Sequence, residues 1–166
     1  KADSFDLIIN EILFNPDESS VDFIEIYNRS EKIINIRYFN VADRESFTSE
    51  FKNCFPIIEE YYLIFPGEYI LLTTNANIIK EQYSITNPDN LIELENMPSF
   101  PDDEGIIIIT DNQLSILDEF HYSENLHFEL LNSCEGVSLE RINSEWPTND
   151  PNNWHSASEN LDFATP

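Results

Sequence analysis

Short segments of alternating apolar side chains, separated by turn residues, constrain the fold of this chain most strongly. In one of them Phe23, Glu25 and Tyr27 share one face of an extended strand. Ile24 and Ile26 share the opposite face. About eight such segments occur, with Gly, Pro, Asn and Asp between them, and this pattern is typical of a β-sandwich. The expected strands cover residues 5–14, 21–28, 33–36 continued by 38–42, 61–65, 68–73, 106–110, 114–122 and 137–142.

Two segments carry additional sequence signals. The four isoleucines of Ile106–Ile109 predict a strand that is buried on both faces. Asn75 can cap a short helix that ends near Tyr83. We therefore expect an all-β protein, an immunoglobulin-like β-sandwich with one short helix, formed by residues 1–166 as a single domain.

The charge of the chain is strongly negative. It contains 32 acidic and 8 basic residues, which gives a formal net charge of −24. Phosphate backbones and anionic membrane surfaces need Lys and Arg, so we expect no nucleic-acid partner and no anionic membrane partner. Cations and basic proteins are favoured instead. No apolar run is long enough for a membrane helix, so the chain is not expected to be an integral membrane segment.

The segment after Ile142 has little periodicity but contains two tryptophans. We expect Trp146 and Trp154 to pack this segment across the sandwich, because aromatic side chains are usually buried. An exposed aromatic surface for a carbohydrate or a peptide is the alternative, and Trp154 beside His155 is its best candidate.

Sequence motifs for catalysis are missing. His121, His127 and His155 occur in no HExxH motif, and the chain has neither a GxSxG motif nor a phosphate-binding glycine loop. The sequence therefore predicts that the protein is not an enzyme. Cys54 and Cys134 have no metal-binding spacing, and both a disulfide and two free thiols remain open.

One acidic loop is a candidate metal site. Asp102, Asp103 and Glu104 precede Gly105, and Ca²⁺ accepts six to eight oxygen ligands in tolerant geometry. The oxygen-rich segment Asn149–Asn153 is a second candidate. The alternative for both is a solvated turn whose acids bind backbone N–H groups. Calcium is the possible cofactor, and we expect no other.

A buried ion pair is the expected role of Arg141. It is the only basic residue after Lys80 and lies in a strand rather than in a loop. Glu25 and Glu11 interrupt apolar strand patterns, and a buried carboxylate needs a partner. We predict that Arg141 pairs with Glu25 or Glu11 in a structural contact. An acid pair for general acid–base catalysis is the less favoured alternative.

Six motifs in a fixed order resemble those of a known family. They are INEILFNP (Ile9–Pro16), DFIEIYN (Asp22–Asn28), PGEYILL (Pro66–Leu72), PSFPDDEG (Pro98–Gly105), GVSLER (Gly136–Arg141) and NWHSA (Asn153–Ala157). The series is similar to the bacterial lamin tail domain family, particularly its secreted Bacteroidetes-type members. The resemblance extends from about Leu7 to Pro166 and implies an immunoglobulin-like sandwich without catalytic residues.

The resemblance also implies a setting for the chain. We expect a non-catalytic structural or protein-interaction module that is extracytoplasmic (periplasmic, cell-surface or secreted) and bacterial. It would be a domain excised from a larger exported protein and tethered through that parent chain. The partner, a protein or a surface, is unknown, and exposed sheet edges would allow a partner to add a strand. Calcium-dependent adhesion or glycan binding is the alternative function.

Overall fold

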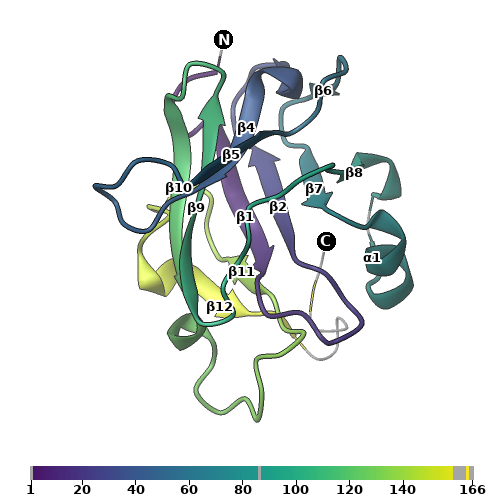
Figure 1. Ribbon diagram of the computed structural model, residues 1–166, viewed down its shortest axis with the longest axis vertical. Coiled ribbons are helices and arrows are strands. Elements are labelled where there is room, and N and C mark those ends of the chain that lie inside the picture. Colours follow the sequence, from purple (N-terminus) through teal and green to yellow (C-terminus); the bar gives the residue numbers. More distant parts are fainter. Residues whose placement is uncertain (1, 86, 159–163, 165–166) are drawn as a thin grey trace.

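Two β-sheets pack face to face in the computed structural model, which describes residues 2–85, 87–158 and 164 (Figure 1). Their strands are β1 (Leu7–Leu13), β2 (Phe23–Asn28), β4 (Phe39–Asp43), β5 (Asn53–Pro56), β7 (Tyr69–Thr73), β8 (Leu91–Glu93), β9 (Glu104–Asp111), β10 (Ile116–Ser123), β11 (Leu139–Arg141) and β12 (Trp154–Ser156). The larger sheet has the order β12-β11-β1-β2-β7-β8, and the smaller sheet has the order β10-β9-β4-β5.

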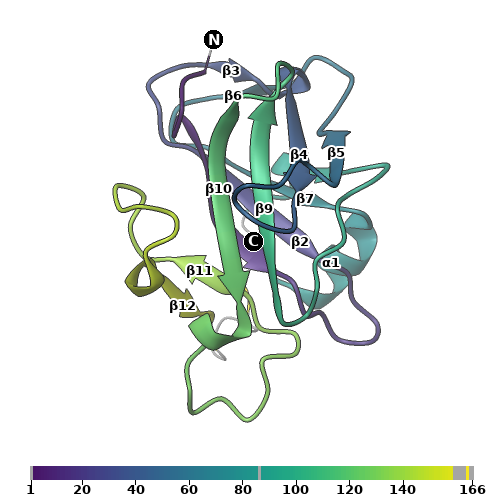
Figure 2. The ribbon, with the colours of Figure 1, turned by 60° about the vertical axis from the view of Figure 1, so that its left-hand side comes forward.

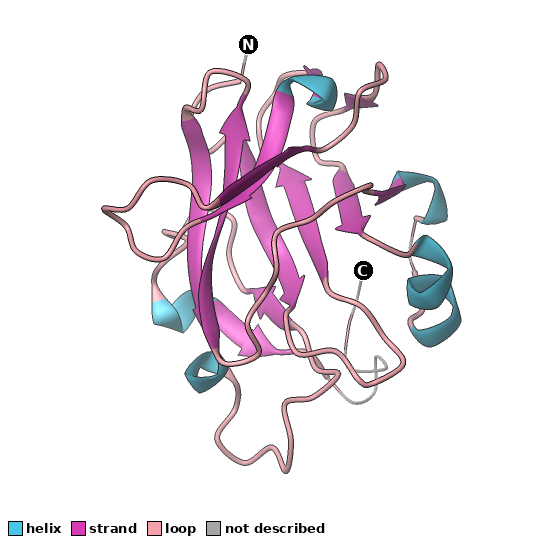
Figure 3. Cartoon of the chain, viewed as in Figure 1, coloured by secondary structure: helices cyan, strands magenta, loops and turns pink. Residues whose placement is uncertain are grey.

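Small elements surround these sheets. Helix α1 (Ala76–Gln82) lies beside β7 and β8, and no other α-helix occurs among the described residues (Figure 3). A separate pair of short strands and four 3-10 turns complete the fold: β3 (Ile34–Asn35), β6 (Leu63–Ile64), η1 (Ile36–Tyr38), η2 (Pro88–Asn90), η3 (Glu124–Leu126) and η4 (Pro151–Asn153). The predicted β-sandwich with one short helix is confirmed.

The core lies between the two sheets and follows the alternation of side chains. Ile24 and Ile26 of β2 face Ile107 and Ile109 of β9 in one buried cluster. Ile106 lies on the outer face of β9 and is also buried. The predicted burial of the isoleucine strand on both faces is therefore confirmed.

The predicted short helix with Asn75 as its cap is also confirmed. The side chain of Asn75 accepts a hydrogen bond from the N–H of Ile78 at 3.2 Å, as an N-cap residue should. Ile79 and Tyr83 pack with Leu13 and Phe23 on the outer face of the larger sheet. The helix thus covers part of that face.

Three strands lie outside the expected ranges, and the first of them is β5, which pairs with β4. β8 runs parallel to β7, and β12 pairs with β11 in the segment thought to be irregular. β8 and β12 are each three residues long, which is too short to show an alternating pattern. Trp154 of β12 is buried, stacks on Phe120 with ring centroids 3.9 Å apart, and is thus a core residue. Trp146, in contrast, is 45% exposed.

A buried ion pair joins the two sheets. Arg141 of β11 and Asp118 of β10 approach to 3.2 Å, and both side chains are 1% exposed. The same Asp118 carboxylate accepts hydrogen bonds from the N–H of Ile9 and from the hydroxyl of Thr148. Arg141 also donates to the carbonyl of Ile9 at 2.7 Å. Burial raises the pKa of Asp118, whereas the Thr148 hydrogen bond and the Arg141 charge oppose that rise.

The predicted partners of Arg141 were wrong. Leu139 and Arg141 point into the space between the sheets, because alternate residues of a strand share a face. Glu11 is paired in register with Glu140, so it points to the outer face of the same sheet. Glu25 is in register with Glu11 and shares that outer face. Arg141 and these two glutamates therefore lie on opposite faces.

The free edge of β10 is closed by a side chain rather than by a strand. The amide of Asn149 donates to the carbonyl of Glu119 at 2.9 Å and accepts the N–H of His121 at 2.8 Å. The N–H of Phe5 donates to the carbonyl of Leu117 on the same strand. These contacts occupy backbone groups that would otherwise attract another chain.

Replacing Arg141 with Met should lower the free energy of unfolding by about 3–5 kcal/mol, because the Asp118 carboxylate would stay buried without its cation. Urea denaturation followed by tryptophan fluorescence measures the change. Arg37→Met is the matched control, since Arg37 is exposed and packs only over the ring of Tyr38 at 5.5 Å. Equal stability of the wild type and Arg141→Met would contradict the structural role of the pair.

Candidate functional site

A row of three glutamates crosses the outer face of the larger sheet. Glu140 of β11 lies opposite Glu11 of β1, which in turn lies opposite Glu25 of β2. Glu11 is 1% exposed and Glu25 is 7% exposed. Side chains directly opposite each other in antiparallel strands are close neighbours, and like charges in such pairs repel. The strand register therefore concentrates acid on a largely buried surface.

Hydrogen bonds hold these carboxylates in place. Glu25 accepts a bond from the side-chain amide of Asn10 at 2.8 Å, and Glu11 accepts one from the hydroxyl of Ser138 at 2.7 Å. His155 Nε2 lies 3.5 Å from the carboxylate of Glu140. Burial, and then the negative charge of Glu11, raises the pKa of Glu25 from 4.5 to about 8. Glu25 therefore keeps its proton at neutral pH.

An aromatic pair continues the same face beyond Glu25. Tyr27 and Tyr69 are opposite each other in β2 and β7, and their rings stack with centroids 4.5 Å apart. Burial raises the pKa of Tyr69, and the charges of Tyr27 and Glu25 add to the rise. The glutamate row and this pair give the outer face a mixed acidic and aromatic character.

The predicted calcium loop places one of its acids, Asp102, near Asp22. Glu104 begins β9, and its N–H donates to the carboxylate of Asp103 at 2.8 Å. Burial, and then the nearby charge of Asp102, raises the pKa of Asp22 from 3.8 to about 7. Among the described residues, no group of three or more His, Cys, Asp or Glu side chains is arranged to hold a metal ion. A calcium site at Asp102, Asp103 and Glu104 stays a prediction.

The second candidate calcium segment has structural contacts. Asn149 binds the edge of β10, and Asp150 accepts the N–H of Asn152 as the N-cap of η4. The side-chain amide of Asn153 donates to the carbonyl of Asn143 at 3.0 Å. These groups hold the segment against the sandwich.

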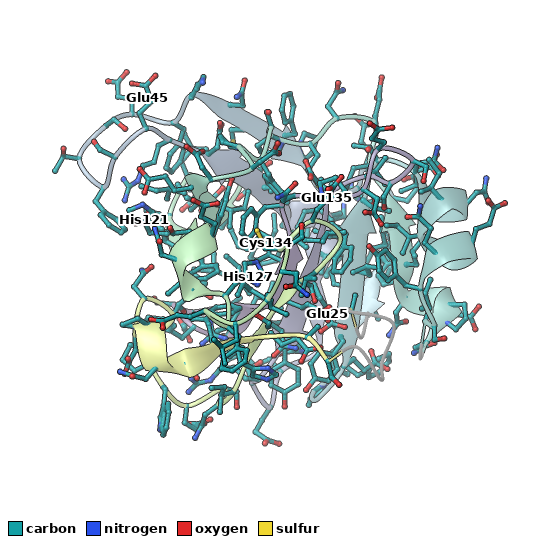
Figure 4. The ribbon with its side chains drawn as sticks, turned by 90° about the horizontal axis from the view of Figure 1, so that it is seen from below. Glu25, Glu45, His121, His127, Cys134 and Glu135 are labelled. Atoms are coloured by element: carbon teal, nitrogen blue, oxygen red, sulfur yellow. The ribbon has the colours of Figure 1, made fainter. Side chains whose placement is uncertain are left out.

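The three histidines lie in different surroundings. His127 is buried and bonds Ser156 through Nδ1 at 2.9 Å. Burial lowers its pKa from 6.5 to about 4, so it is neutral at physiological pH. His121 lies toward the left of the view in Figure 4, away from His127 and Glu25, and its Nε2 is 4.0 Å from the carboxylate of exposed Glu104.

A surface hollow of about 310 Å³ lies next to His121. It is lined by Glu104, Asp150, the ring of Phe47 and the stacked pair Phe120 and Trp154. His121 and Glu104 are a solvent-exposed histidine–acid pair, which can bind a polar group of a partner.

The two cysteines, Cys54 and Cys134, are both free thiols.

Sequence reasoning missed Asp118 and Thr148. Asp118 shares a strand face with Phe120 and Tyr122, which are buried in the core. An acid at an inward position of an apolar alternation is the same signal that drew attention to Glu25. Thr148 lies in an irregular segment and carried no comparable signal.

Comparison with known proteins identifies the family. The model of the lamin tail domain matches residues 1–124. The chain belongs to the lamin tail domain family. Lamin tail domains are immunoglobulin-like, non-enzymatic modules, so the predicted family and fold class are confirmed.

A solved structure supports the same fold. The crystal structure of a DUF4876 family protein from Bacteroides thetaiotaomicron superimposes with a TM-score of 0.59 at 12% sequence identity. The similarity covers 99% of this lamin tail chain and 75% of that chain. No curated protein matches the sequence. The described residues include no helix that is long and apolar enough to cross a membrane.

The buried acids should make the lamin tail domain less stable as the pH rises. The pKa of Glu25 rises from 4.5 in the unfolded chain to about 8 in the folded protein, and the pKa of Asp22 rises from 3.8 to about 7. The stability that each protonated acid contributes is therefore complete below its unfolded pKa and is lost as the pH rises through its folded pKa. The pKa of His127 is lowered, so this residue makes the free energy of unfolding rise with pH, but only below pH 6.5. The free energy of unfolding should therefore fall between pH 6.5 and pH 8, by at most about 1.4 kcal/mol per pH unit and proton.

Melting temperatures recorded across that interval test this expectation. Glu25→Gln keeps the shape of the side chain without its charge and should reduce the dependence on pH. Glu45→Gln, at an exposed position, is the control and should leave it unchanged. A melting temperature that rises from pH 6.5 to pH 8 would contradict the assignment of protonated acids.

Proposed function

We propose that this lamin tail domain is a non-catalytic interaction module that binds a protein partner with a basic surface. One observation carries the proposal: the ion pair of Arg141 and Asp118 is buried between the sheets, with both side chains 1% exposed. A substrate cannot reach such groups. Their contacts hold the scaffold together, and most of the other acids of the described residues are exposed or partly exposed.

The charge of the surface supports a basic partner. The chain has a net charge of −24, and only one basic residue follows Lys80. Complementary charge speeds association and excludes partners of the same sign. The exposed pair of His121 and Glu104 and the acids of the loop before β9 add polar groups to this surface.

We also infer an extracytoplasmic location in a bacterium, periplasmic, cell-surface or secreted, within a larger exported protein. The order of the six sequence motifs supports this location, because it resembles that of secreted family members. Fractionation of cells that express the native gene, with immunoblotting, tests the inference. Recovery of the protein in the cytoplasmic fraction alone would contradict it.

A charged-peptide titration tests the basic-partner proposal. Fluorescently labelled oligolysine should bind the domain in about 50 mM NaCl and release in about 500 mM NaCl, because salt screens exposed charges. Oligoglutamate of the same length is the control and should not bind. Fluorescence anisotropy reports both. Equal binding of the two peptides, or no binding of oligolysine at low salt, would contradict the proposal.

Calcium-dependent adhesion or glycan binding is the second candidate function. Its support is the closeness of Asp102 to Asp22, because burial and then the charge of Asp102 raise the pKa of Asp22 to about 7. A bound cation would stabilise the folded state and raise the melting temperature. The main proposal predicts equal melting temperatures in calcium and in EDTA. A rise in calcium that Asp102→Asn removes would establish the second candidate instead.

A further inference from the structure

The turn between β9 and β10 has a leucine where the backbone favours glycine. The carboxylate of Asp111 accepts hydrogen bonds from the N–H groups of Gln113 and Ser115, both at 2.9 Å. The backbone carbonyl of Asp111 accepts a hydrogen bond from the N–H of Leu114. Leu114 has φ 64°, in the left-handed region. Hairpin loops of this kind normally place Gly at that position, because a side chain there is strained. Leu114 thus destabilises the turn that contains it.

Burial of the Leu114 side chain offsets little of this strain. The side chain is 55% exposed. With Ser49, Glu50 and Phe51 it lines a surface hollow of about 430 Å³, called the hairpin groove below. A strained and exposed apolar side chain that also lines a hollow indicates a role outside the folding of the chain.

The groove has a firm apolar base. Phe51 packs on a buried cluster of Ala42, Ile106 and Ile108 on the outer face of the smaller sheet. Ile116, opposite buried Thr110 on the same face, is 38% exposed and extends the apolar surface along β10. Figure 2 shows β9 and β10 side by side, joined by the turn that contains Leu114. The side chains beneath the groove are therefore already fixed by the sheet.

We propose that the hairpin groove docks a protein segment that presents an apolar side chain next to a lysine or arginine. The apolar side chain contacts Leu114 and Phe51, and the base pairs with Glu50. This inference deepens the proposed function and rests on it.

Charge selects this occupant over a second copy of the chain. Glu50 is the charged residue among those that line the groove. A second copy would bring another net charge of −24 to the contact. Like charges repel at close range, whereas a basic segment is attracted.

A pair of peptides and three variants test the groove. The probe is a short labelled peptide that alternates lysine with leucine, and the reference probe has glutamate in place of lysine. Leu114→Gly should weaken binding of the lysine–leucine peptide about tenfold or more, because the apolar contact is lost. Glu50→Gln should also weaken it and reduce the preference over the glutamate peptide.

Phe5→Gly is the matched control. Phe5 also has φ 64° and is 46% exposed, but it is not among the residues that line the groove. It should bind the peptide as the wild type does. Glycine fits the left-handed region, so Leu114→Gly should keep or raise the melting temperature. This result separates docking from folding.

The outcomes are distinct. Equal peptide binding by Leu114→Gly and the wild type would contradict docking in the hairpin groove but would leave the basic-partner module unchallenged. No binding of the lysine–leucine peptide to either protein would contradict both proposals. A clear fall in the melting temperature of Leu114→Gly would make the leucine structural and overturn the proposal. Dimerisation of the wild type that Leu114→Gly abolishes, seen in sedimentation equilibrium, would replace the basic segment with a second copy.

Discussion

The contact between Asp118 and Arg141 is the interaction on which the rest of the structure depends. β1 pairs with β11 at Glu11 and Ile12, and the register of its pairing with β2 shifts between Ile9 and Glu11. At Ile9, the carboxylate of Asp118 and the guanidinium of Arg141 bind the backbone N–H and carbonyl. A buried backbone group without a partner is destabilising, so this pair replaces the missing ladder contacts and joins the two sheets at the same time.

The segment that follows β11 depends on this contact. Thr148 bonds both Asp118 and Arg141, and its carbonyl accepts the indole N–H of Trp154 at 2.7 Å. Asn149, the next residue, then reaches the edge of β10. The buried charged groups thus join the two sheets, and the backbone groups at the edge of β10 are bound by Asn149. The outer faces of the sheets and the other edge strands, β5, β8 and β12, remain as surfaces through which a non-catalytic module can bind.

Much of the fold could be predicted from the sequence, because alternation reports which faces of a strand are buried. The strands with long patterns, the cap at Asn75 and the family motifs were all informative. Alternation does not tell which face points inward, and Glu25 was therefore paired with an arginine on the other side of its sheet. Three-residue strands and the backbone angle of Leu114 have no sequence signal, since both depend on contacts between distant residues.

Hydrogen exchange at Ile9 tests most directly whether the Asp118–Arg141 pair joins the sheets. The N–H of Ile9 donates to the Asp118 carboxylate at 2.8 Å. If the pair is part of the cooperative core, this amide should exchange only through global unfolding, as slowly as the amides of β9. Exchange of Ile9 through a local opening, at a free energy well below that of β9, would contradict the account.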